Sequence, residues 1–233
     1  YEIGVRLVGS EMCIRDSQTA LGFIVDSALF KSYNIICYRA KVLISGRSSM
    51  KINDVIKKCI KIPGISIKQA EYSMELILNT KEGKGSMTFF SLFSGLSLAY
   101  IFINSPTWTA PDLRSDSSIT KGPLLLNYCV TGRCEMILNN KNFVYIKDRE
   151  LSLTECFAQK EYVYPKRIYE GLEFFIDIDT FTLENTWVQN EFSIDFRKIS
   201  EMFCPHGSTY ISTATHETEA VSYTHLRAHE TDS

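Results

Sequence analysis

Short apolar runs separated by turn residues fill the central part of this 233-residue chain and constrain its fold more than any other feature. The runs are four to eight residues long, as buried strands are, and Gly, Asn, Asp and Ser lie between them. They are residues 87–93, 96–103, 124–130, 134–138, 143–146, 151–154 and 172–178. Short strands at this spacing pair in antiparallel order in sandwiches and barrels. We therefore predict a mainly β fold.

The segments around these runs have a different character. Residues 181–204 are predicted to be helical, because apolar side chains from Ile194 to Phe203 recur at a loose helical period, and a last strand is expected at 208–212. Residues 50–82 are expected to be helical or irregular, with a break at Pro63-Gly64, and residues 105–122 form a predicted polar loop. The predicted order is strands followed by helices.

Both ends of the chain match translated sequencing adapter. Residues 221–231 back-translate without a mismatch to the transposase end and index-side adapter of short-read libraries, and residues 7–16 match its reverse complement in another frame. Residues 1–6 fit the flow-cell sequence followed by an index. We therefore expect 1–17 and 220–233 to be artefacts and exclude them from the fold, as one excludes a tag.

The segment 18–49 is expected to be read-through of DNA upstream of the gene. It lacks a clear helical or strand period, and the codons of Gly46 to Ser49 could form a purine-rich ribosome-binding site just ahead of Met50. The alternative is a genuine extension, which an N-terminal peptide mapping inside 18–49 would establish. With translation starting at Met50, the predicted domain spans 50–219.

Charge and cysteine usage restrict the class of protein. Excluding the adapter ends removes three arginines and five carboxylates from 25 basic and 27 acidic residues, which leaves 22 of each. A surface that grips DNA needs a basic excess, so direct DNA binding is not expected. Within the predicted domain, 50–219, there are five cysteines, an odd number without regular spacing, which is typical of a reducing, cytoplasmic compartment. They are Cys59, Cys129, Cys134, Cys156 and Cys204.

One motif resembles a known family. Residues 124–135 (Leu-Leu-Leu-Asn-Tyr-Cys-Val-Thr-Gly-Arg-Cys-Glu) resemble the "hydrophobic-x-N-Y/H-C-x-x-G-R-x-E" stretch in the sensor region of AraC/XylS-type transcription regulators. Residues 143–145, 150–153 and 171–178 match later pieces of that region in the same order, and the whole resemblance covers residues 74–219. Each piece is weak alone, whereas their order and spacing make the combination specific.

The resemblance implies an effector-sensing domain with a cupin-like antiparallel β-barrel fold followed by helices. In the family, a DNA-binding domain of two helix-turn-helix units comes next. Here the chain runs into adapter where the connecting helix would begin, so we expect a truncated fragment that reaches DNA only through its missing C-terminal domain. Two departures from the family stand out: the family often has Gly before a D-L-S turn where this chain has Asp148-Arg149-Glu150-Leu151, and Tyr169 or Glu170 replaces a His that is often present before the last matching strand.

Catalytic chemistry is not indicated. A metal cupin needs two His one residue apart on a strand, a carboxylate and a third His, but only His206 and His216 lie outside the adapter ends, and both follow the predicted strands. Cys204 and His206 lack the second ligand pair of a zinc site. The chain has no Gly-x-Ser-x-Gly elbow and no glycine-rich phosphate loop. We expect no metal, no cofactor and no enzymatic activity.

Five aromatic and polar residues are candidate ligand contacts. Tyr128, Arg133, Glu135 and Tyr145 could line a barrel lumen and bind a small polar effector, and Trp108 could act as its lid. The alternatives are core or rim packing for the two tyrosines, an ion pair that anchors a turn or bridges strands for Arg133 and Glu135, and simple capping of the barrel end for Trp108.

Strand alternation assigns faces within the motif. It places Leu124, Leu126 and Tyr128 on one face of the strand and Leu125, Asn127 and Cys129 on the other.

We interpret the native part as the sensor half of a cytoplasmic AraC-type regulator that binds an unknown small-molecule effector. In the family, amphipathic helices such as 194–203 pair sensor domains, so the resemblance also implies a homodimer; packing of this helix against its own barrel is the alternative. The alternative function is a stand-alone cupin-like small-molecule-binding protein or a non-metal enzyme.

Overall fold

The computed structural model describes residues 62–70, 73–109, 123–138, 141–155, 158–192 and 194–214. All but Ala214 belong to one contact unit of the chain, Val42–Thr213. The predicted adapter segments, 1–17 and 220–233, and the predicted read-through at 18–49 lie outside the described residues. Within the described residues, no helix has the length and apolarity needed to cross a membrane.

The described residues form eleven strands and three α-helices, and ten of the strands precede the helices. The strands are β1 (Ile65–Gln69), β2 (Ser73–Asn79), β3 (Lys84–Phe93), β4 (Leu96–Asn104), β5 (Thr107–Thr109), β6 (Leu124–Leu138), β7 (Phe143–Lys147), β8 (Glu150–Thr154), β9 (Ala158–Val163), β10 (Ile168–Ile176) and β11 (Tyr210–Thr213). The helices are α3 (Ile178–Glu184), α4 (Thr186–Phe192) and α5 (Phe196–Phe203), followed by the 3₁₀ turn η1 (Pro205–Gly207).

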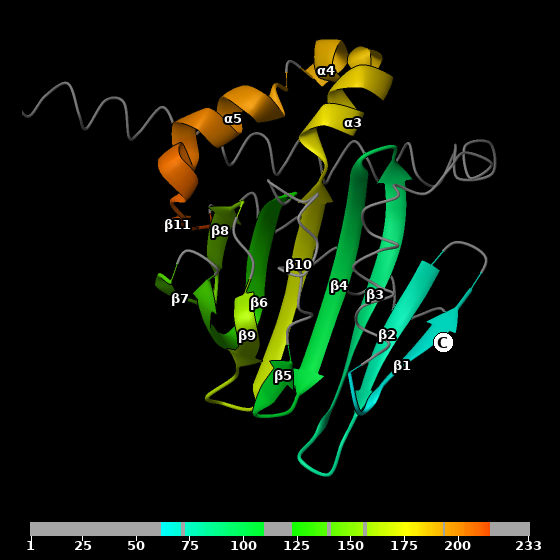
Figure 1. Ribbon diagram of the computed structural model, residues 1–233, viewed down its shortest axis with the longest axis vertical. Coiled ribbons are helices and arrows are strands. Elements are labelled where there is room, and N and C mark those ends of the chain that lie inside the picture. The colour runs from blue at the N-terminus through cyan, green and yellow to red at the C-terminus, as the bar shows by residue number, and fades with distance from the viewer. Residues whose placement is uncertain are drawn as a thin grey trace, which may run out of the picture. The chain divides into compact units, whose positions relative to one another are not determined.

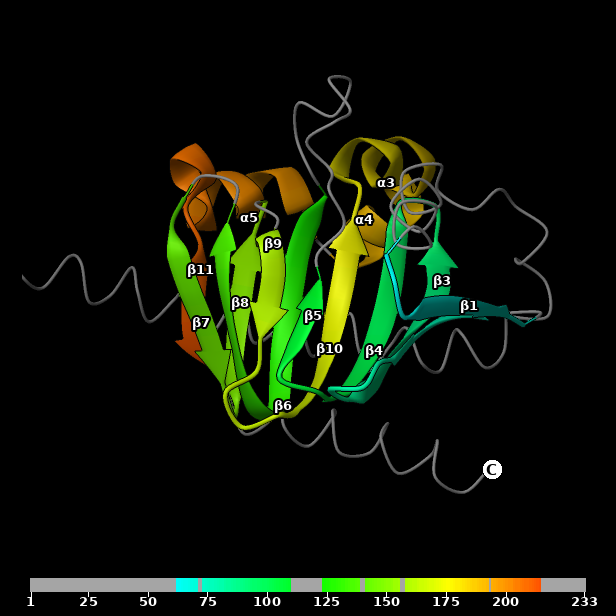
Figure 2. The ribbon, with the colours of Figure 1, turned by 60° about the horizontal axis from the view of Figure 1, so that its bottom comes forward.

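The strands pair in antiparallel order throughout the described part of the chain. The main path runs β1-β2-β3-β4-β10-β6-β8-β11, and β6 also pairs with β7 and β9, the latter of which pairs with β5. Figures 1 and 2 show α3, α4 and α5 gathered beyond the end of the strands at which β10 finishes. The predicted fold class, a mainly β antiparallel barrel or sandwich followed by helices, is confirmed.

The long strand β6 joins two parts of this sheet, one that contains β10 and β8 and one that contains β7 and β9. Its residues 124–132 pair with β10 and β8, and residues 133–138 pair with β7 and β9. A register shift opposite Glu170 and Gly171 leaves one extra residue in β6, which is a β-bulge. Just beyond it, Gly132 adopts a φ of +102° and donates its N–H to the carboxylate of Asp148. The Thr131-Gly132 pair, predicted to separate two strands, is therefore a bend within one strand.

Several strands were not expected from the sequence. β1 and β2 lie in the segment predicted to be helical or irregular, which is wrong for residues 65–79. β5 lies within the predicted polar loop, and β9 was not predicted at all. The predicted helical segment 181–204 is confirmed as helical, but it is divided into three short helices with α3 beginning at Ile178.

Both faces of the central strands are buried. The inner face carries one core of apolar, aromatic and thiol side chains, namely Ile65, Leu76, Leu78, Phe89, Ala99, Ile101, Ile103, Trp108, Cys129, Cys134, Ile146, Tyr164 and Tyr169. On the opposite face, Leu126 and Tyr128 lie across from Phe174 and Leu172 of β10, and all four are buried. The predicted alternation along 124–129 is therefore present in the structure.

Helix α5 packs on its own chain. Its Phe203 ring lies 4.8 Å from that of Tyr210 in β11, and the Ser200 hydroxyl donates to Glu155 Oε1 at 2.6 Å. The Phe196 ring meets that of Phe181 in α3 at 5.0 Å. These contacts correspond to the alternative in which the amphipathic helix packs against its own barrel.

We expect Asp195→Ala to destabilise the protein by about 1 kcal/mol, because Asp195 is the N-cap of α5. Its carboxylate accepts from the backbone N–H groups of Arg197 and Lys198 at 3.0 and 3.1 Å. Urea denaturation would measure the loss. Asp179→Ala is the matched control, because Asp179 caps no helix: it is exposed in the first turn of α3, pairs with Arg197 and should contribute about 0.5 kcal/mol. Equal losses for the two variants would contradict the assigned cap.

Candidate functional site

Five buried polar side chains form a patch on the inner face of the sheet. Glu173 of β10 lies between Ala99 of β4 and Asn127 of β6, and Asn127 in turn lies opposite Ser152 of β8. Residues opposite one another in an antiparallel ladder share one face, so these side chains are neighbours. We call the set the inner polar patch; its members are Ser97, Asn127, Ser152, Thr154 and Glu173.

Glu173 is the member that most requires explanation. The residue is 9% exposed, and within the described part of the chain no group forms a hydrogen bond or ion pair with its carboxyl. Burial raises the pKa of the Glu173 carboxyl to about 7. A buried carboxylate without a partner is costly, so near neutral pH this group is balanced between its charged and neutral forms.

Tyr169 connects the patch to the aromatic part of the inner core. Its hydroxyl donates to Asn127 Oδ1 at 2.8 Å, and its ring packs on that of Tyr164 with 5.4 Å between centroids. The side chain reaches Asn127 by lying along β10 over Gly171, where an added Cβ would come within 2.8 Å of the Tyr169 hydroxyl oxygen. Gly171 is therefore required for this close approach. Burial raises the pKa of both tyrosines, which keeps their hydroxyl protons in place.

Two buried cysteines border the same region. Burial raises the pKa of Cys129 to about 12, and burial together with the charge of Glu173 raises that of Cys134 well above its usual value. Both thiols therefore stay protonated, which makes them poor nucleophiles. Among the residues that the structure describes, no group of three or more His, Cys, Asp and Glu side chains is placed to hold a metal ion.

Three of the five predicted ligand contacts, Arg133, Glu135 and Tyr145, lie next to one another on the surface of the protein. Arg133 Nε lies 2.6 Å from Glu135 Oε1, and the Arg133 guanidinium carbon lies 4.2 Å from the centroid of the Tyr145 ring. Glu135 and Tyr145 are opposite each other in the β6–β7 ladder, on the face away from the buried Cys134. The arrangement is a surface ion pair along one strand with a cation–π contact to the next.

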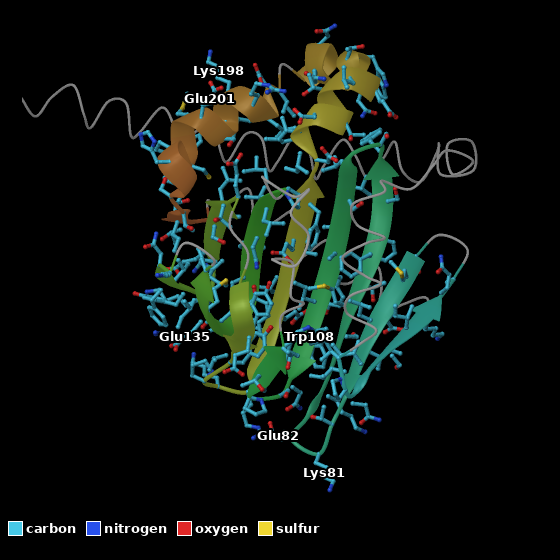
Figure 3. All side chains as sticks on the ribbon, in the orientation of Figure 1. Lys81, Glu82, Trp108, Glu135, Lys198 and Glu201 are labelled. Carbon is cyan, nitrogen blue, oxygen red and sulfur yellow. The ribbon has the colours of Figure 1, made fainter. Side chains whose placement is uncertain are left out.

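The other two predicted contacts lie elsewhere. Trp108 is buried in the inner core, and Tyr128 is buried on the opposite face of β6. Figure 3 shows Trp108 and Glu135 on different strands. The five residues therefore do not line a single lumen, and only Trp108 lies in the core that surrounds the inner polar patch. Ligand binding by each of them stays a prediction.

The central residues of the patch were not selected from the sequence, although a signal was present. Glu173 places a charge near the start of the apolar run 172–178, and Asn127 places an amide in the middle of 124–130. A polar group inside a run buried on both faces needs a partner, a ligand or a change of protonation. What could not be seen is that the two groups meet, because the two residues are more than forty positions apart in the sequence.

We expect Tyr169→Phe to destabilise the protein by about 1–2 kcal/mol, because it leaves the Asn127 carbonyl oxygen buried without its donor. The change removes only one oxygen atom and keeps the ring contact with Tyr164. Tyr164→Phe is the matched control, since its hydroxyl interacts with the Cys134 thiol, a weaker partner, and a loss below ~1 kcal/mol is expected. Equal unfolding free energies for Tyr169→Phe and the wild type would show that the hydrogen bond contributes nothing.

Comparison with known proteins gave structural likenesses only. No family model matches the chain, and no curated protein matches it. Among solved structures, it is similar to the AraC-like transcriptional activator CuxR, at 8% identity over 73% of this chain and 53% of that one, with a TM-score of 0.36. It is similar to a Cupin 2 conserved barrel domain protein from Salinispora arenicola, at 8% identity over 55% of this chain and 88% of that one, with a TM-score of 0.31. It is also similar to the Clostridium difficile EutQ protein, at 13% identity over 40% of this chain and 68% of that one, with a TM-score of 0.28. The chain thus spans about half the length of the activator.

Proposed function

We propose that the native part of this chain is the effector-sensing domain of an AraC/XylS-type transcription regulator, and that the effector binds at the inner polar patch. The observation that carries the proposal is the buried carboxyl of Glu173, which has no partner among the described residues. An unpaired buried charge lowers stability, so a fold that keeps one is expected to use it. A few convergent polar groups in an apolar surround are typical of a small-molecule site.

The residues that carry the family resemblance support this assignment. The first motif, 124–135, contributes Asn127 to the patch and Gly132 to the bend that lets β6 join both parts of the sheet. The later piece, 171–178, contributes Glu173 and the glycine over which Tyr169 lies. Two segments far apart in the sequence therefore meet at one site.

The position of Glu173 offers a route from the effector to the helices. Glu173 lies on β10 four residues before Asp177, the N-cap of α3, whose carboxylate accepts from Thr180 N–H. Gly95, in the turn between β3 and β4, accepts the Asp177 N–H at 2.8 Å. An effector that shifts β10 would therefore move the start of the helical segment, which in the proposed regulator would lead toward a DNA-binding half. Such a shift couples two sites only if the effector binds one arrangement more tightly than the other.

Sequencing the source locus across the adapter junction tests the regulatory part of the proposal. Two helix-turn-helix units in frame after Glu219 are expected. A stop codon soon after Glu219 would contradict the proposal and leave the alternative, a stand-alone cupin-like small-molecule-binding protein or non-metal enzyme.

A binding screen tests the sensing part. The full chain would be screened against small polar molecules by the shift of its melting temperature, and each hit would be repeated with Glu173→Gln. Hits that stabilise the wild type and lose that effect in the variant are expected. Hits that act equally on both proteins would place the effector away from the inner polar patch.

A further inference from the structure

We infer that the inner polar patch takes a ligand with a positively charged nitrogen, an ammonium or substituted amine, and that the Glu173 carboxylate is its counter-ion. The inference rests on the proposed function, since it names the effector class for the same site. Four features of the described residues lead to it: the balance of buried charge, the hydrogen-bonding groups of the patch, its aromatic neighbours and the small residue beside Glu173.

Buried charge in the described part of the chain is entirely negative. Glu173 and Asp177 are buried there, whereas no lysine or arginine is. Asp177 is committed to the first turn of α3, through Thr180 N–H. Glu173 is therefore the charge left to be balanced. An anionic ligand would add a like charge to a low-dielectric interior, and a neutral ligand would leave the carboxyl to be neutralised only by a proton, whereas a cation neutralises the ionised carboxylate directly.

The hydrogen-bonding groups around Glu173 favour a donor. The Tyr169 hydroxyl gives its hydrogen to Asn127 Oδ1, so its oxygen is left to accept. An ionised carboxylate only accepts, and a serine hydroxyl such as that of Ser152, the cross-strand neighbour of Asn127, can also accept. An ammonium group donates up to three hydrogen bonds and accepts none, so it matches these acceptors, whereas the amide N–H groups of Asn127 are the donors that the patch itself supplies.

Aromatic rings lie on the same face as the carboxyl. Phe89 of β3 is opposite Ala99, which is opposite Glu173, so the three share one row across the sheet. Phe175, two residues after Glu173 on the same face, packs on Phe89 with 5.5 Å between ring centroids. Aromatic faces attract organic cations, and a carboxylate beside such rings is a recurring arrangement for binding them. Between the rings and the carboxyl, Ala99 contributes only a methyl group.

The test compares three probes of one chain length: butylammonium, butanol and butyrate. Each would be titrated calorimetrically into the full chain at a pH above the pKa of Glu173. Butylammonium is expected to bind, with butanol and butyrate at least tenfold weaker. Glu173→Gln is expected to lower butylammonium affinity roughly 10- to 100-fold, the range for a hydrogen bond to a charged group. Glu170→Gln is the matched control; it removes a carboxylate from the opposite face of β10, where Tyr100 Oη donates to Glu170 at 2.6 Å, and should leave affinity unchanged.

A second measurement needs no variant. Lowering the pH through about 7 protonates Glu173, so butylammonium affinity for the wild type should fall. The other titratable groups near Glu173 are Cys129, Cys134, Tyr164 and Tyr169, and burial raises the pKa of each, so none titrates in this range. An affinity that does not change between about pH 6 and pH 8 would overturn the inference.

The remaining outcomes separate the inference from the function on which it rests. Tighter binding of butyrate or butanol than of butylammonium overturns the cationic ligand but keeps a small-molecule site at the patch. A wild type that binds none of the three probes, while neutral or anionic hits from the wider screen bind and depend on Glu173, also overturns the cationic class alone. A wild type that binds neither the probes nor any molecule of the wider screen removes both proposals.

Discussion

Glu173→Gln is expected to stabilise the protein at neutral and alkaline pH and to remove most of the pH dependence of its stability between about pH 5 and pH 8. Burial raises the pKa of this carboxyl in the folded protein to about 7, whereas the unfolded chain keeps the ordinary value. Between these two values the folded state holds a proton that the unfolded state has released. The free energy of unfolding therefore falls as the pH rises through this range and is constant above it.

The shift in pKa corresponds to about 3 kcal/mol of stability that the wild type has at pH 5 and lacks at pH 8. Glutamine keeps the shape of glutamate and cannot ionise. The variant should thus match the wild type within ~1 kcal/mol at acidic pH, allowing for the change of a buried hydrogen-bonding group, and exceed it by about 3 kcal/mol at alkaline pH.

Urea denaturation of the wild type, Glu173→Gln and Glu170→Gln at both pH values would measure this difference. Glu170→Gln should keep the pH dependence of the wild type, because Glu170 lies on the other face of β10, bonded to Tyr100. Parallel stability–pH curves for the wild type and Glu173→Gln would show that the Glu173 carboxyl is solvated or paired in the folded protein. The cationic-ligand inference would then lose its main support.

A gain in stability in Glu173→Gln would mean that Glu173 lowers the stability of the wild type, as expected of a residue kept for ligand binding. Substitutions that stabilise a protein at the expense of binding are common where a site holds an unfavourable group. A cation that binds the carboxylate would offset the same cost. The protein with its effector bound should then approach the stability of Glu173→Gln at alkaline pH.

The sequence predicts the β class of this fold because its signal is local. Runs such as 87–93 and 151–154 are short, apolar and bounded by turn residues, and each is part of a strand. β1 and β2 were missed, although Ile65 and Ile67 alternate with polar residues as a strand requires, because a helical spacing of apolar residues precedes them. β9 was missed since its sequence, AQKEYV, is largely polar; its pairing with β6 and β5 holds it in place.

The candidate site was less predictable, because it depends on which strands become neighbours. Alternation correctly put Asn127 and Cys129 on one face of β6. It could not show that β10 pairs between β4 and β6 and so sets Glu173 against Asn127. Arg133 and Glu135 were reasonable candidates from their chemistry, but the bulge before Gly132 shifts the alternation of β6. Cys134 therefore faces the core and its two neighbours face outward.

Gly132→Ala, at the bend in β6, should destabilise the protein by about 3 kcal/mol or more. The loss is expected from backbone strain and overpacking together. Gly132 has a φ of +102°, which residues with a Cβ rarely adopt. An added Cβ would also lie 2.1 Å from the backbone oxygen of Ile168 and 2.9 Å from the Cα of Tyr169. Both contacts are to the backbone of β10, which cannot move aside without breaking its ladder with β6.

Gly64→Ala is the matched control, and urea denaturation would compare the two variants with the wild type. Gly64 also has a positive φ, +83°, but it lies in an exposed turn and its added Cβ would first meet the side chain of Thr80, which can rotate away. Its loss should stay near 1–2 kcal/mol, the cost of backbone strain alone. Because the bend positions Tyr169 beside Asn127, Gly132→Ala should also weaken binding of any ligand at the inner polar patch. Equal losses for the two glycine variants would show that β6 does not need the bend to join the two parts of the sheet.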